Sequence, residues 1–318
     1  MSRLFRDVEG GVLFPQGSVV CIGAFDGLHL GHRALVRHAV ARARALGVPA
    51  VALGFEPLPR EFFAKDNPPP RLMLARDKVA TLRELGVDSV GLLRFDARMA
   101  AITAEDFVRD MLVRRLGARE VWIGPKFHFG NRRGGDIALL QAMGAELGFV
   151  AGEIEPVHLN GERISSTRIR ELIVAGEFGH AGELLGRPYS IGGRVVRGRQ
   201  LGRTLGFPTA NLRFPKTPAL SGIYATWVHG VFEQPWPSVS SFGTRPTVEG
   251  VEPLLEAGDA QEIDFSAFEQ ALKDAPQTPE AAPVIEPIQP AEAASEAPAL
   301  VADLEPHELP SFDFAGAL

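Results

Sequence analysis

The stretch from residue 19 to residue 46 constrains the fold more than any other part of the sequence. Its apolar run, Val19 to Ile22, is typical of a strand that is buried on both faces of a parallel sheet. From Arg33 to Leu46, apolar residues recur at helical spacing. A strand that passes through a glycine-rich turn into a helix can bind an anion, because backbone N–H groups at the helix start point toward the ligand. The glycines of this turn are Gly23, Gly27 and Gly31.

Two histidines, His29 and His32, stand three residues apart at the end of the same turn. Beside a phosphate, imidazoles can stabilise the negative charge that develops during group transfer. Two alternatives are a helix start with two surface histidines and a pair of metal ligands. The turn is not a Walker A loop, because no Gly-Lys-Ser/Thr follows it. The pattern therefore favours phosphate chemistry.

Strands and helices alternate after this stretch. The sequence predicts further strands over residues 48–55, 87–95 and 119–124 and helices over residues 76–85 and 103–116, with Thr103 as an N-cap. Such alternation is typical of an α/β fold with a doubly wound parallel sheet. In such sheets, ligands bind at the carboxyl ends of the strands.

The loop after the fourth predicted strand is rich in glycine, aromatic and basic residues. It could be an ordinary strand-to-helix loop with a hydrophobic staple, or a clamp for a flat aromatic ligand and its phosphate. The residues that would form the clamp are Phe127, Phe129, Gly130, Arg133 and Asp136.

Another candidate anion site lies at the start of a predicted helix near residue 166. The hydroxyls of Ser166 and Thr167 could be ordinary caps. However, Arg168 and Arg170 fall in or near the first turn, where the helix dipole disfavours cations. A bound anion at this helix start would explain their position.

From residue 190 the chain reads as short strands and turns, which predicts a small β-barrel. Gly202 and Gly206 would let a phosphate lie against the backbone, and Thr209 and Asn211 offer neutral oxygens that suit Mg²⁺. A glycine-rich hairpin is the alternative.

These segments together resemble the bacterial bifunctional riboflavin kinase/FAD synthetases. Gly-x-Phe-Asp-Gly-x-His-x-Gly-His, from Gly23 to His32, is similar to the signature of their nucleotidyltransferase domain, and Ser165 to Arg170 resembles the Ser-x-Thr-x-Ile-Arg motif of the wider superfamily. Gly206 to Leu212 resembles the riboflavin kinase signature. Three residues depart from the family pattern, namely Leu58 in place of histidine, Lys126 in place of an acidic or amide residue, and His128 in place of arginine.

The resemblance implies two reactions, ATP plus riboflavin giving FMN, and ATP plus FMN giving FAD and pyrophosphate, with Mg²⁺ as cofactor. It implies His29 and His32 as catalytic residues of the second reaction and Glu256 as the general base of the first. The residues implied for the adenylyltransferase's ATP are Gly23, Phe25, Asp26, Gly31, Ser166, Thr167 and Arg170; those for the flavin are Phe127, Phe129, Gly130, Arg133 and Asp136; and those for the kinase's ATP are Gly202, Gly206, Thr209 and Asn211, with Thr209 and Asn211 as metal ligands.

The resemblance stops near Glu256, and a different kind of sequence follows. From Ala257 onward there are 13 acidic residues and one basic residue, and 8 of the 25 prolines lie between Pro276 and Pro310. Low hydrophobicity with high net charge predicts disorder. We therefore expect a nucleotidyltransferase domain over 1–186, a partial β-barrel over 187–257 with exposed strand edges and impaired kinase activity, and a disordered tail over 258–318.

Composition narrows the class of partner. The net charge of −6 comes from the tail, which leaves 32 basic and 26 acidic residues, a net charge of +6, for the rest. A mildly basic body suits nucleotides but does not indicate nucleic-acid binding. The sequence shows no secretion signal and no apolar run of about 18 residues, and its one cysteine, Cys21, lies in a predicted buried strand, so we expect a cytoplasmic protein without a membrane partner.

Two other functions stay open at this point. One is a nucleotidyltransferase that uses a different phosphorylated acceptor. The other is a flavin-binding or interaction protein with impaired catalysis. The sequence leaves the oligomeric state open.

Overall fold

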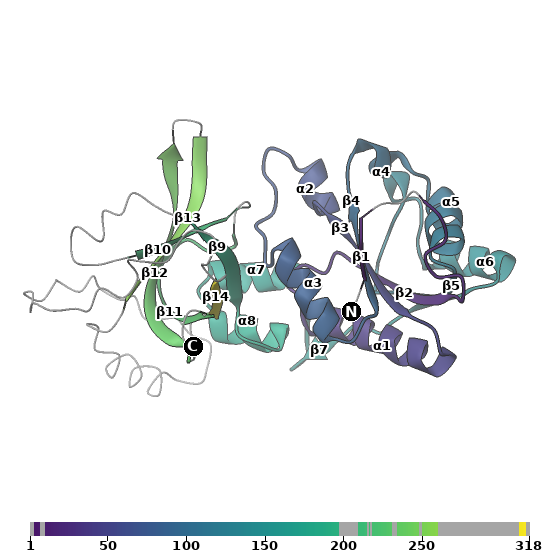
Figure 1. Cartoon of the computed structure of the whole chain (residues 1–318), viewed down its shortest axis with the longest axis horizontal. Helices are drawn as coiled ribbons and strands as arrows, with labels where there is room; N and C mark the ends of the chain where they lie inside the picture. The colour runs from purple at the N-terminus through teal and green to yellow at the C-terminus, as the bar shows by residue number, and fades with distance from the viewer. Residues whose placement is uncertain are drawn as a thin grey trace, which may run out of the picture. The chain divides into compact units, whose positions relative to one another are not determined.

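The computed structural model describes residues 3–6, 10–196, 209–214, 216, 218–230, 234–247, 250–259 and 312–315 (Figure 1). The chain divides into two compact units, of which the first contains residues 1–168 and 184–186. The second contains residues 169–183 and the chain from 187 onward. Residues 169–183, which the sequence assigned to the first domain, are thus grouped with the second unit.

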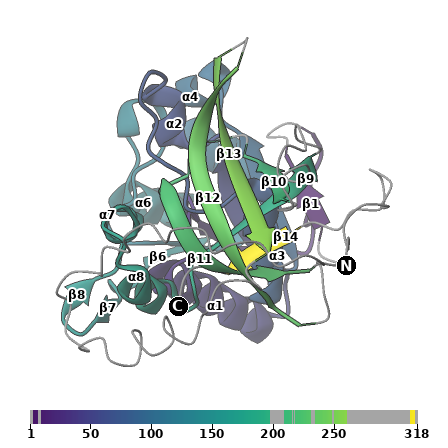
Figure 2. The ribbon, with the colours of Figure 1, turned by 90° about the vertical axis from the view of Figure 1, so that its left-hand side faces the viewer.

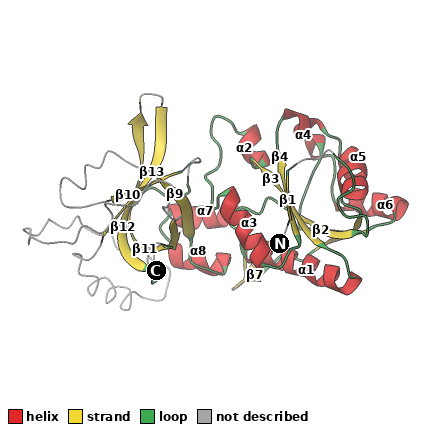
Figure 3. Ribbon diagram, in the orientation of Figure 1, coloured by secondary structure: helices red, strands yellow, loops and turns green. Residues whose placement is uncertain are grey.

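The first unit is built on a parallel six-stranded sheet in the order β1-β4-β3-β2-β5-β6. This confirms the predicted α/β fold. The strands are β1 (Arg3–Phe5), β2 (Ser18–Ile22), β3 (Ala50–Glu56), β4 (Ser89–Arg94), β5 (Ala118–Ile123) and β6 (Val150–Glu153). The helices between them, red in Figure 3, are α1 (Leu30–Leu46), α2 (Pro59–Phe63), α3 (Ala75–Glu84), α4 (Ala97–Ala101), α5 (Ala104–Asp106), the π-helix η1 (Phe107–Arg115), the 3-10 turn η2 (Asn131–Arg133) and α6 (Ile137–Leu147).

Alternate residues of the central strand serve two hydrophobic cores. Val19 and Cys21 pack with the helices α1 and α3 on one face of the sheet. Val20 and Ile22 pack with η1 and α6 on the other face. Because strand side chains alternate between faces, a strand that is apolar at every position needs helices on both sides.

Some elements differ from those that the sequence predicts. Helix α1 begins at Leu30 rather than Arg33, because His29 is its N-cap. The predicted helix 103–116 starts as α5, with Thr103 as the expected N-cap, and continues as η1. The short edge strand β1, strand β6 and the hairpin of β7 (His158–Leu159) and β8 (Glu162–Arg163) were not predicted.

The second unit contains a closed antiparallel barrel in the order β10-β13-β12-β11-β14-β9 (Figure 2). Two helices, α7 (Ser166–Val174) and α8 (Phe178–Leu185), precede it, and α7 crosses the boundary between the units. The barrel strands are β9 (Ser190–Val196), β10 (Thr209–Arg213), β11 (Gly222–His229), β12 (Trp236–Thr247), β13 (Gly250–Asp259) and β14 (Phe312–Ala315).

The predicted barrel segment, residues 187–257, does not close by itself, but the strand edges that were expected to be exposed are paired. Strand β14, which comes from the predicted disordered tail, pairs with β9 on one side and with β11 on the other. It thereby supplies hydrogen-bond partners to two strands that would otherwise be edges. Four residues of β-compatible sequence are too short a signal to stand out in a Pro/Glu/Ala-rich tail. Residues 260–311 and 316–318 lie outside the described residues, as do Gly202 and Gly206.

Candidate functional site

The predicted phosphate and flavin loops leave the sheet from neighbouring strands. Ile22 at the end of β2 pairs with Ile123 at the end of β5, in parallel. The chain order of the strands reverses between β2 and β5. The carboxyl edge at such a switch point is where open α/β sheets bind ligands.

The two histidines lie together at the start of α1. Their rings are stacked, with centroids 3.7 Å apart and planes 15° apart. The backbone N–H of His32 donates to Nδ1 of His29 over 3.2 Å, so a neutral His29 carries its proton on Nε2. Gly31 permits this arrangement, because a Cβ there would stand 3.2 Å from the His29 ring.

His32 is held in the neutral form. Burial lowers its pKa well below 6.5, and the charges of His29 and Lys78 lower it further. The Phe25 ring meets the His32 ring edge-on at 5.4 Å. A neutral imidazole has one N–H that can donate a hydrogen bond to a phosphate oxygen and one nitrogen that can accept, and it adds no net charge to the site.

A hydrogen bond joins the histidine turn to the second predicted phosphate motif. Oγ of Ser166, the first residue of α7, donates to the carbonyl oxygen of Asp26 over 2.9 Å. The Asp26 carboxylate accepts the N–H groups of Leu72 and Met73, each over 3.2 Å. The two motifs, 140 residues apart in the chain, thus lie side by side.

The remaining residues of the hydroxyl-arginine motif have separate surroundings. The Thr167 hydroxyl accepts from Arg60 over 3.5 Å. Arg168 forms an ion pair with Glu162 at 2.5 Å, so a bound anion is not needed to explain its position. Arg170 lies one turn further along α7, among the residues grouped with the second unit.

The predicted flavin loop contains one core residue and one accessible aromatic. Phe129 is buried and packs against Phe107 at 5.8 Å, whereas Phe127 is half-buried and stacks near Phe129 at 6.1 Å. Asp136 caps α6 by accepting the N–H of Leu139 over 3.0 Å. The loop thus contributes the Phe129 ring to the core and leaves Phe127 half-buried and Arg133 exposed, while the flavin clamp stays a prediction.

Gly130 of this loop has φ +73°, and a Cβ there would stand 2.6 Å from the Ala104 backbone. The path of the loop at this position therefore requires glycine.

The three residues that depart from the family pattern differ in their surroundings. Leu58 is buried as the N-cap of α2, and Lys126 and His128 are exposed.

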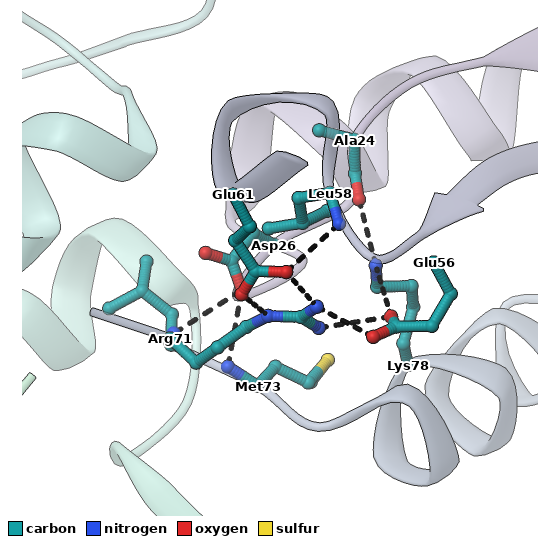
Figure 4. A network of polar contacts seen from close by, with 9 residues as sticks. Ala24, Asp26, Glu56, Leu58, Glu61, Arg71, Met73 and Lys78 are labelled. Carbon is teal, nitrogen blue, oxygen red and sulfur yellow. Dashed lines mark hydrogen bonds and ion pairs between the residues drawn. The ribbon is translucent and has the colours of Figure 1, made fainter. Parts of the chain in front are cut away.

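The sequence reasoning missed a buried charged network beside the histidine turn (Figure 4). Arg71 pairs with Glu56 at 2.6 Å and with Glu61, and the Lys78 ammonium donates to the Ala24 carbonyl over 3.0 Å. Lys78 shares the apolar face of α3 with Leu82, and a cation on an apolar face is the signal that could have revealed it.

An aromatic cluster at the carboxyl edge was also missed. Phe62, Phe63 and Phe95 meet edge-on at 5.2 to 5.8 Å, and Phe63 is 70% exposed. The Lys65 ammonium lies 5.2 Å from the centre of the Phe62 ring. The adjacent phenylalanines of α2 were the signal, because exposed aromatic side chains are unusual on an ordinary surface.

In the second unit, two predicted kinase residues occupy paired positions. Asn211 in β10 lies directly opposite Glu256 in β13, and Asn211 is 7% exposed. Thr209 begins the same strand β10. The barrel thus brings a buried amide and the position of the predicted general base into register.

Two family models match the chain in succession. The FAD synthetase model matches residues 13–168, and the riboflavin kinase model matches residues 185–275. The second match extends beyond Glu256, where the resemblance was expected to stop.

Curated relatives cover the join between the two matches. The "Bifunctional riboflavin kinase/FMN adenylyltransferase" of Escherichia coli strain K12 is 44% identical over 257 residues, which is 80% of this chain and 82% of the relative. The chain belongs to this family.

Two other members of the bifunctional family are similar to this chain over about the same length. The Pseudomonas fluorescens enzyme is 44% identical over 268 residues (81% of this chain, 86% of the relative), and that of Haemophilus influenzae is 40% identical over 255 residues (80% and 83%). A solved structure from Streptococcus pneumoniae, described as a macrolide-efflux protein, superposes with a TM-score of 0.64 at 26% identity and covers 86% of this chain and 96% of its own. Within the described part of this chain, none of the helices has the length and apolar character that crossing a membrane requires.

Proposed function

We propose that the first unit transfers the adenylyl group of ATP to FMN and that the second unit makes FMN from riboflavin and ATP. The observation that carries the first assignment is the hydrogen bond between Ser166 and Asp26, which supports a single phosphate cradle built from both motifs. Family membership supports both reactions.

In the transfer, an oxygen of the FMN phosphate attacks the α-phosphorus of ATP, the bond from that phosphorus to the bridging oxygen breaks, and pyrophosphate leaves. No protein nucleophile is needed, so the residues act by positioning and by stabilising charge. His29 and His32 would contact the phosphates where negative charge builds up. Ser166, Thr167 and Arg170 would hold the triphosphate.

The flavin would lie toward the aromatic side chains at the carboxyl edge of the sheet. The half-buried Phe127 and the exposed Phe63 are rings against which a flat isoalloxazine could stack. This placement would bring the FMN phosphate to the same edge as the histidine turn, because the loops come from neighbouring strands.

For the kinase reaction, Mg²⁺ fits the oxygens offered by Thr209 and Asn211, since neutral oxygens are ligands that this hard cation accepts. The metal would neutralise charge on the transferred phosphate. Glu256, which lies opposite Asn211, would accept the proton of the ribityl hydroxyl. The buried thiol of Cys21 supports a reducing, cytoplasmic location, and the substrates are small molecules.

The test is an incubation of the purified full chain with ATP and Mg²⁺ and either riboflavin or FMN, with the products separated by chromatography. FAD from FMN supports the first assignment, and FMN from riboflavin supports the second. Consumption of ATP with pantetheine phosphate or nicotinamide mononucleotide, and none with FMN, would instead identify a different acceptor. A purified protein that carries flavin but releases no pyrophosphate would be a binding protein.

A further inference from the structure

We propose that Lys78 is a positioning residue for adenylyl transfer, because its ammonium holds the Ala24 carbonyl and thereby fixes the turn that presents the two histidines. This proposal rests on the proposed function of the first unit. Lys78 does not act on the substrate itself but through Ala24, Phe25 and the ring of His32.

The contact is direct and fully buried. Lys78 lies in α3, its side chain is 0% exposed, and its Nζ donates to the carbonyl oxygen of Ala24 over 3.0 Å (Figure 4). Ala24 is the second residue of the turn between β2 and α1. A bond from a charged donor to a carbonyl in a buried site is stronger than a neutral one, so it can fix the plane of the Ala24–Phe25 peptide.

The next residue needs such support. Phe25 has φ +51°, a conformation that is costly for a residue with a bulky side chain. Its ring is fully buried and meets the His32 ring edge-on at 5.4 Å, and His32 in turn stacks on His29 at 3.7 Å. A rotation of the Ala24–Phe25 peptide would therefore move the Phe25 ring and, through it, both imidazoles.

The surrounding carboxylates keep the ammonium in place. Glu56 lies 4.0 Å from Nζ of Lys78 and also binds Arg71, which pairs with Glu61 as well. Buried charges persist only where they are paired in this way. Burial lowers the pKa of Lys78 to about 8, and the nearby carboxylates of Glu56, Asp26 and Glu61 oppose that shift, so the ammonium form predominates near neutral pH.

The deciding experiment measures FAD formation from FMN and ATP by Lys78→Met, Lys78→Gln and a matched control, Arg76→Met, which removes an exposed cation from the same helix. For Lys78→Met we expect kcat to fall about ten- to hundred-fold, the range seen when a supporting contact to a functional group is lost. The KM for ATP should change less than about three-fold, since the substrate contacts stay in place. Lys78→Gln keeps a donor and should recover part of the rate, and Arg76→Met should match the wild type.

Riboflavin phosphorylation and thermal unfolding are measured on the same samples, so that a loss of folded protein is seen as such. A Lys78→Met protein that folds and keeps the wild-type kcat, or one that loses ATP affinity and kcat in proportion, would overturn the proposal. If Lys78→Met does not fold, Lys78→Gln decides. Glutamine keeps a polar donor in the buried network, but its side chain is one bond shorter than that of lysine, so it holds the Ala24 carbonyl less well. A reduced kcat at unchanged KM then supports the proposal, and an unchanged kcat overturns it. Wild-type protein that forms no FAD would refute the function of the unit rather than the role of Lys78.

Discussion

At the scale of single residues, the candidate site combines a neutral imidazole, His32, with a buried lysine, Lys78, whose charge helps to lower the pKa of that imidazole. His32 stays neutral because burial and the neighbouring charges of His29 and Lys78 disfavour the imidazolium.

Replacement of either histidine should impair the chemical step rather than ATP binding. We expect His29→Ala and His32→Ala each to lower kcat for FAD formation by roughly 100-fold or more, because groups that meet the developing charge contribute on that scale. Steady-state kinetics on FMN and ATP gives the values, and His158→Ala, an exposed histidine of the β7–β8 hairpin, is the control. Normal turnover in both variants would remove the histidines from the mechanism.

The depressed pKa of His32 also makes a prediction about stability. Below the ordinary pKa of about 6.5, the unfolded chain binds a proton at His32 that the folded chain does not, so the contribution of His32 to stability is present above that pH and is lost as the pH falls. The slope is at most about 1.4 kcal/mol per pH unit. Denaturant unfolding between pH 7.5 and 5.5 should thus show the gap between wild type and His32→Gln shrinking toward acid pH; a constant gap would contradict the neutral state.

At the scale of elements, the loop from Gly124 to Asp136 must adopt a fixed path to present Phe127. Gly130→Ala places a Cβ at φ +73°, 2.6 Å from the Ala104 backbone, so we expect a raised KM for FMN and a loss of roughly 1–3 kcal/mol of stability. Gly134→Ala is the matched control, because its φ is −69° and its nearest neighbour is 3.4 Å away. FMN titrations and thermal unfolding of both variants provide the measurement, and equal behaviour would show that the loop path does not matter.

The elements around the site could be predicted because their periodicity is strong. Val19 to Ile22 is apolar at every position, and apolar residues recur at helical spacing in α1. The strand, the turn and the helix could therefore be predicted from the sequence. The Ser166–Asp26 contact could be expected only from the resemblance, since it joins residues 140 positions apart. The Arg71–Lys78 network depends on which loops the sheet order brings together, and one sequence gives no direct signal of that order.

At the scale of the whole molecule, the closed barrel of the second unit depends on a strand, β14, that comes from the end of the chain. Removal of residues 312–318 deletes β14 and exposes the edges of β9 and β11. We expect riboflavin phosphorylation to fall several-fold or more and the barrel to unfold at a lower temperature. FAD formation from FMN should stay within about two-fold of wild type, because β14 pairs with barrel strands and not with the sheet that carries the histidine turn.

Removal of residues 316–318 alone is the control for that truncation, since it leaves β14 intact. Equal kinase activity in the two truncated proteins would show that the barrel does not depend on β14. The closing strand was missed in the sequence because its pairing partners, β9 and β11, are set by the barrel rather than by any local pattern.

Cys21 gives the first unit a built-in probe of its own opening. It is the only cysteine of the sequence, lies in the central strand with 0% exposure, and has a pKa raised to about 12 by burial. A thiol reagent can therefore react only with molecules in which the packing of Cys21 against α1 and α3 has opened, and the rate of alkylation in native buffer reports how often that happens. A nucleotide that binds the turn directly after this strand should slow the alkylation in proportion to its occupancy, which would make binding measurable without any turnover.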